Sequence, residues 1–108
     1  MNALAVNLSF LIQPPSSVQA GTPFTVRVLA QGNGGTPLPE VTMTLSLVQI
    51  SGSGNLTGTT IRVTGANGFE TFANLAVSQP GTYALQVSSA LTGYAAAGQQ
   101  SLTFTVTP

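Results

Sequence analysis

The stretch that decides the fold is residues 80–87, Pro-Gly-Thr-Tyr-Ala-Leu-Gln-Val. Large apolar side chains recur there at every second position, which is the period of a β-strand with one buried face. Gly81 and Tyr83 have the spacing of a tyrosine corner, in which the ring packs in the core and the hydroxyl binds a nearby backbone group. The segment therefore predicts a strand over 82–88. The side chains expected to face the core are Tyr83, Leu85 and Val87.

The same two-residue period recurs on both sides of this segment, with glycine and proline between the runs. Pro14 and Pro15 end the first run, because proline lacks the N–H that a ladder needs. Arg27 is expected to point to solvent, and a polar loop is expected over 32–40. The predicted strands are 4–12, 24–30, 41–47, 60–64, 69–72, 82–88 and 101–107. Their further inward residues are Leu4, Val6, Leu8, Phe10, Ile12, Phe24, Val26, Val28, Val41, Met43, Leu45, Leu47, Leu102, Phe104 and Val106.

Residues 60–64 and 69–72 flank Gly-Ala-Asn-Gly, which favours a β-hairpin. With a loop over 65–67, Arg62 lies opposite Glu70 and the two form a cross-strand ion pair, whereas a loop one residue longer breaks that pairing. Phe72 and Leu75 cannot both face inward on a regular strand. A bulge or strand end is therefore expected near Ala73-Asn74.

About seven short strands in 108 residues predict a single domain over 1–108, an immunoglobulin-like Greek-key β-sandwich of two sheets. The cysteine pair and the core tryptophan of antibody domains are missing. Aliphatic and phenylalanine packing is therefore expected to hold the fold.

The composition excludes most chemistry. The only charged residues are Arg27, Arg62, Glu40 and Glu70, the net charge is zero, and Lys, Asp, His, Cys and Trp are absent. Without these groups we expect no metal, no cofactor and no catalysis: Glu40 and Glu70 are the only carboxylates, and no His or Lys can activate a serine. Zero net charge argues against nucleic-acid binding. The absence of an apolar run of about 18 residues argues against membrane insertion. The first residues lack the basic region of a signal peptide.

Several phrases resemble bacterial immunoglobulin-like repeat domains of invasin-like surface proteins, and the resemblance covers the whole chain. They are 8–14 (LSFLIQP), 20–26 (AGTPFTV), 41–45 (VTMTL), 56–60 (LTGTT), 67–77 (NGFETFANLAV) and 81–85 (GTYAL). The resemblance implies one of several tandem repeats in an extracellular or cell-surface protein, with neighbouring domains of the same chain as partners. The chain departs from many such repeats in lacking the Asp residues of junction calcium sites and the Lys of isopeptide crosslinks.

The leading hypothesis is a non-catalytic structural spacer or scaffold module of an adhesin-like protein, monomeric when isolated. In an alternative, the end loops bind a carbohydrate or a host surface protein, with Tyr94, Asn33 and Glu40 as contacts. In another, residues 4–12 pair with a neighbouring subunit in a filament, because no charge or lysine protects that edge. Structural roles are expected for Tyr83, Gly81, Arg62 and Glu70.

Overall fold

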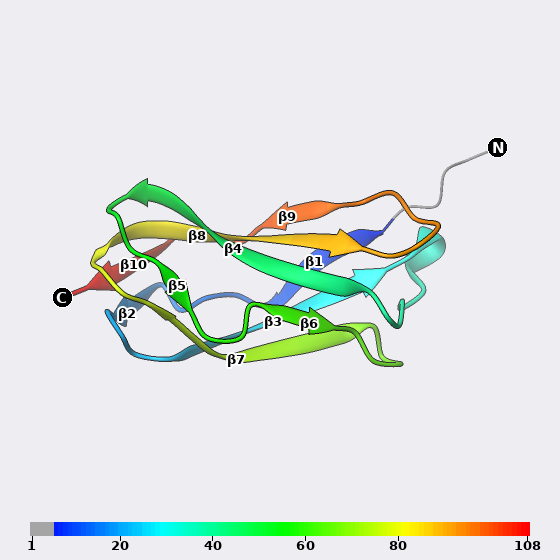
Figure 1. Cartoon of the computed structure of the whole chain (residues 1–108), viewed down its shortest axis with the longest axis horizontal. Coiled ribbons are helices and arrows are strands. Elements are labelled where there is room, and N and C mark those ends of the chain that lie inside the picture. Colours follow the sequence, from blue (N-terminus) through cyan, green and yellow to red (C-terminus); the bar gives the residue numbers. More distant parts are fainter. Residues whose placement is uncertain (1–5) are drawn as a thin grey trace.

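Two sheets pack face to face in the computed structural model of the chain, which describes residues 6–108. The first sheet has the order β1 (Asn7–Ile12), β3 (Phe24–Gln31), β7 (Phe69–Val77) and β5 (Leu56–Thr57). The second has the order β2 (Ser17–Gln19), β10 (Phe104–Thr107), β8 (Gly81–Ala90), β4 (Thr42–Ser51) and β6 (Ile61–Val63), with β9 (Gly98–Gln100) beside β8. The strands run along the long axis of the molecule (Figure 1). The predicted all-β, two-sheet fold is confirmed.

The core lies between the sheets and contains most of the side chains that the two-residue period placed inward. Tyr83, Leu85 and Val87 are fully buried, as the alternation over residues 80–87 predicts. The Phe104 ring lies 5.5 Å from that of Phe24 and 6.2 Å from that of Tyr83, measured between ring centroids. The Phe24–Phe104 contact joins the first sheet to the second, and the Tyr83–Phe104 contact lies within the second. Other buried residues are Val6, Leu8, Val26, Val28, Val41, Met43, Leu45, Phe72, Leu75 and Val106.

The bulge expected in the strand after the glycine turn is confirmed. Phe24 pairs with Leu75, and Val26 pairs with Phe72. Two steps along β3 therefore match three steps along β7, so β7 carries one extra residue at Ala73-Asn74. The extra residue is what lets Phe72 and Leu75 both be fully buried.

The predicted hairpin over 60–72 is wrong. β6 pairs with β4 in the second sheet, and β7 pairs with β3 in the first. The turn between them closes with a hydrogen bond from Gly68 N–H to the Gly65 carbonyl (3.0 Å), and the Gly68 carbonyl then accepts one from Ala30 N–H (2.7 Å). The four-residue turn therefore passes from one sheet to the other. A local turn signal specifies the reversal of the chain, but long-range partners decide which sheet each strand joins.

Further differences concern short segments and strand ends. Three short strands (β2, β5 and β9) and the 3-10 turn η1 (Asn33–Gly35) were not predicted, because segments of two or three residues are too short to show a periodicity. Leu102, expected inward, is 67% exposed, since β10 begins only at Phe104. Ile12 is also exposed, because the register shifts between Phe10 and Ile12. Leu4 of the predicted first strand lies outside the described residues.

Candidate functional site

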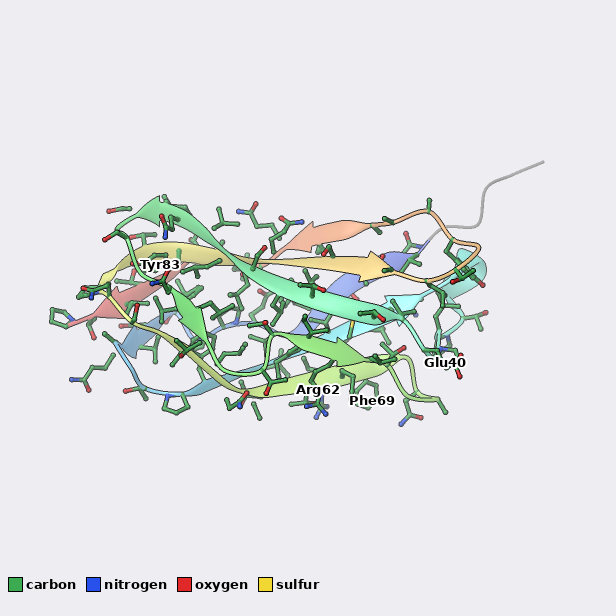
Figure 2. All side chains as sticks on the ribbon, viewed as in Figure 1. Glu40, Arg62, Phe69 and Tyr83 are labelled. Carbon is green, nitrogen blue, oxygen red and sulfur yellow. The ribbon has the colours of Figure 1, made fainter. Side chains whose placement is uncertain are left out.

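The three residues predicted to contact a ligand come from connections at one end of the molecule. η1, which contains Asn33, and the β8–β9 connection, which contains Tyr94, lie at the same end in Figure 1, and Glu40 is labelled there in Figure 2. The side chain of Asn33 lies outside what the structure describes. The topology therefore brings the three segments to one end of the sandwich.

Glu40 is exposed and lies in a turn that its backbone conformation defines. Its φ is 63°, in the left-handed region, and it follows Pro39. Proline followed by a residue of positive φ is the pattern of a type II turn. The N–H of Glu40 donates to the Thr64 carbonyl (2.9 Å), which attaches the turn to the end of β6. The backbone of Glu40 is thus fixed while its carboxylate faces solvent.

Tyr94 is half-buried and packs against the core with Leu91 and Ala97. Its N–H donates to the Leu91 carbonyl (3.0 Å), which closes a tight turn. Ser89 holds the base of the same connection: its hydroxyl accepts a hydrogen bond from Ala97 N–H (2.9 Å). This packing gives Tyr94 a structural role in its own loop.

The other charged groups are engaged with protein neighbours. Arg62 Nη2 and Glu70 Oε1 lie 3.4 Å apart, so the predicted ion pair forms, but between the two sheets rather than across a hairpin. The Arg27 guanidinium lies 5.0 Å from the centroid of the Phe69 ring, and its Nε donates to the Thr71 hydroxyl (3.1 Å). Arg27 therefore lies on the outer face as expected, but its charge covers an aromatic ring. Figure 2 shows Arg62 and Phe69 near one another on the same side of the molecule.

Tyr83 makes the most connected polar contact of the structure, at the opposite end from Glu40 (Figure 2). Its hydroxyl accepts from Gly54 N–H (2.9 Å) and lies 3.1 Å and 3.2 Å from the carbonyls of Gln79 and Pro80. One hydroxyl thus satisfies the buried Gly54 N–H of the β4–β5 connection and meets partly buried carbonyls of the β7–β8 connection. This matches the backbone contact that the Gly-x-Tyr spacing predicts.

Three glycines make room for that hydroxyl, and two of them were not assigned this role from the sequence. A Cβ added at Gly52, Gly54 or Gly81 would lie 2.7, 2.8 or 2.9 Å from the Tyr83 hydroxyl oxygen. Gly81 also has a φ of +155°, and an added Cβ would collide with the Ser51 carbonyl. By itself, the spacing Gly52-x-Gly54 indicates only a turn. Its function depends on a tyrosine almost 30 residues away.

Two buried hydroxyls also escaped the sequence reasoning. Thr64 Oγ1 donates to the Leu38 carbonyl (2.7 Å) and accepts from Val41 N–H (2.9 Å). Ser101 Oγ accepts from Leu85 N–H (2.9 Å), in the place that a backbone carbonyl of a regular strand would take. A hydroxyl residue at the end of a predicted strand gives only a weak signal for such a role.

The described part of the chain offers no enclosed site. Residues 6–108 contain no pocket, and no group of three or more acidic, His or Cys side chains that could hold a metal ion. Within the same residues, no helix has the length and hydrophobicity needed to cross a bilayer. Glu40 and Glu70 come from different elements, and Glu70 is paired with Arg62. What the surface offers chemically is hydroxyl and amide groups on flat strand faces.

No protein-family model matches the chain, and the curated proteins include none that is significantly similar to it.

Proposed function

We propose that the chain is a non-catalytic, immunoglobulin-like spacer module of a bacterial cell-surface or secreted protein. The strand order supports the immunoglobulin-like part of this proposal. The N-terminal segment is divided between the sheets, with β1 on β3 and β2 on β10, and the strands β3, β7 and β5 lie opposite β10, β8 and β4. The contacts of Tyr83 at the start of β8 agree with it.

The observation that carries the spacer role is the placement of the first and last strands, β1 and β10. The molecule measures 50 × 23 × 19 Å, so it is more than twice as long as it is wide. β1 begins toward one end of the long axis, and β10 finishes at the other (Figure 1). Copies joined through their termini would therefore extend head to tail. Each added copy would increase the reach of the protein by most of its long axis.

The pairing of β2 with β10 suits a module that is pulled through its ends. The two strands are parallel, with Ser17 beside Thr105 and Gln19 beside Thr107. Tension on the termini reaches β2 through β1, which is paired with β3, and it pulls β2 toward its start and β10 toward its end, in opposite directions along one axis. The hydrogen bonds between parallel strands are then loaded together in shear instead of being opened one at a time. This arrangement supports a module that transmits force without extending.

Small-angle scattering of two copies joined end to end tests the spacer role. We expect a maximum dimension close to twice the 50 Å long axis of one copy. As a matched control, two copies joined through about ten Gly and Ser residues should bend freely and have a shorter average dimension. If the directly joined pair has the dimension of two copies folded side by side, the spacer role is contradicted.

A further inference from the structure

β6 is an edge strand of the second sheet, at the side opposite β2, and it has an open edge. It pairs with β4 on one side, and no strand of residues 6–108 pairs with it on the other. The residues that flank it bond toward β4: the Thr60 carbonyl accepts a hydrogen bond at 2.7 Å, and the Thr64 N–H donates one at 2.9 Å. Main-chain groups of successive strand residues point to opposite sides. The N–H and C=O groups of Ile61 and Val63 therefore face away from β4.

The side chains of this edge are apolar and exposed. Ile61 is 58% exposed and Val63 is 53% exposed. Arg62, between them, points toward Glu70 of the other sheet, so its charge does not cover the outer face. Lysine and proline on the edge are common means of preventing strand pairing, and β6 contains neither. The edge thus combines free backbone groups with two apolar side chains.

The outermost strand of the other sheet, β1, is less suited to pairing. Ala30 lies opposite Leu8, but its N–H and C=O form hydrogen bonds with Gly68 and Leu38 on the side away from β1. The main-chain groups of Leu8, and those of Phe10 two residues later, therefore point away from β3 and are free. Leu8 is buried, and Phe10 packs on the core, so neither side chain is available to a partner strand. The register shift after Phe10 also interrupts the edge, as bulges do at protected edges.

We propose that β6 pairs with β6 of a second copy of this chain, antiparallel and across a two-fold axis. In this pairing Ile61 lies opposite Val63 of the partner subunit, and Val63 lies opposite Ile61 of the partner subunit. Arg62 then faces Arg62 of the partner subunit, and each Glu70 carboxylate balances the charge of its own Arg62. A net charge of zero leaves no overall repulsion between the copies. The partner strand is therefore matched in hydrogen bonding and apolar contact.

The contact is small. Three residues from each copy bury much less surface area than the roughly 1,200 Å² that a stable interface buries. The dimer of a single module is therefore weak. Modules in a tandem array would pair cooperatively along two chains, because each contact raises the effective concentration of the next. The pairing is a property of β6 and does not rest on the proposed spacer function.

Hydrogen exchange of backbone amides, measured by NMR at low and at millimolar protein concentration, tests the pairing. We expect protection of the Ile61 and Val63 amides to rise several-fold with concentration, while that of Leu8 and Phe10 stays constant. No rise at Ile61 and Val63 would overturn the proposal. A rise at Leu8 and Phe10 instead would also overturn it, and would place the contact at β1, as the filament hypothesis requires.

Two charge-matched variants complete the test. Val63→Lys should abolish the concentration-dependent protection of the Ile61 amide, since it places a charge on the edge. Leu102→Lys adds the same charge at a side chain that is 67% exposed, on the β9–β10 connection, and should leave the protection unchanged. An equal loss in both variants would contradict pairing at β6. If Val63→Lys loses its native NMR spectrum, Ile61→Lys replaces it, and the protection is then measured at the Val63 amide.

Discussion

The hydroxyl oxygen of Tyr83 contacts the backbone of two connections, β4–β5 and β7–β8. Gly54 brings an N–H to it, and Gln79 and Pro80 bring carbonyls. The ring below it is fully buried and contacts Phe104. Because a buried donor without a partner costs more than the bond contributes when present, this oxygen has a larger effect on stability than an exposed hydroxyl.

Replacing Tyr83 by Phe keeps the ring and removes the hydroxyl. We expect a loss of about 1–3 kcal/mol in the free energy of unfolding, because the buried Gly54 N–H loses its acceptor. Denaturant titration followed by tyrosine fluorescence or circular dichroism measures the loss. Tyr94→Phe is the matched control and should change stability by less than about 0.5 kcal/mol, because Tyr94 is only half-buried. Equal losses in the two variants would contradict the role given to Tyr83.

Single residues could be placed from the sequence where their partner lies nearby in the chain. The Gly-x-Tyr spacing predicts the burial of Tyr83 and its contact with backbone just before it. The Gly54 contact could not be predicted, because its partner is separated by 29 residues. The same limit applies to Thr64, whose hydroxyl meets Leu38 and Val41 only after the chain has folded.

At the scale of the element, β7 shows that the spacing of inward-facing residues in a strand can locate a bulge. Phe72 and Leu75 are three residues apart and both fully buried. One extra residue in β7 accounts for this, and parity alone predicts it. The sequence does not say that β7 pairs with β3, because the alternation of β7 fits any strand with a buried face.

Deleting Ala73 should therefore be tolerated. Without it, two steps along β7 match two steps along β3, and Phe72 and Leu75 still face inward. We expect a cost below about 2 kcal/mol in unfolding free energy, within the range of ordinary substitutions. Deleting Thr71 is the control: it moves Glu70 and Phe69 to the wrong faces and should abolish cooperative unfolding. If both deletions have the same effect, the bulge is not located at Ala73-Asn74.

The error over residues 60–72 has a physical cause at the same scale. A Gly-rich turn between two strands favours a hairpin locally, yet each strand here has a stronger partner far along the chain. β6 instead pairs with β4 at three positions and β7 with β3 at five, and these pairings place the two strands in different sheets. The Arg62–Glu70 ion pair forms although the predicted hairpin does not, because the four-residue turn keeps the two residues close in either arrangement.

At the scale of the whole molecule, the composition and the elongated shape both favour the proposed spacer role. A chain with four charged residues, and without His, Cys, Lys or Asp, has few groups for catalysis. Length and strand count made a two-sheet fold predictable, but the elongated shape and the position of the ends come only from the structure. The loop residues Tyr94, Asn33 and Glu40 lie at one end, where ligand contact stays a hypothesis.

We propose that the β2–β10 ladder bears force applied to the ends of the module. The Thr105 N–H donates to the Ser16 carbonyl (3.0 Å) in this ladder, and the Ala20 N–H donates to that of Thr107 (2.8 Å). Thr105→Pro removes one of these donors. Thr103→Pro changes an exposed residue just before β10 and serves as the matched control.

Single-molecule force spectroscopy on several joined copies, held by their two ends, tests this claim most directly. We expect each wild-type copy to unfold in one step that lengthens the chain by roughly 300 Å, since an extended residue spans at most about 3.6 Å. At a fixed force, Thr105→Pro should unfold about five- to tenfold faster, as one ladder bond contributes about 1 kcal/mol, while Thr103→Pro should match the wild type. Equal unfolding rates for Thr105→Pro and the wild type, or gradual extension without a distinct step, would contradict the account.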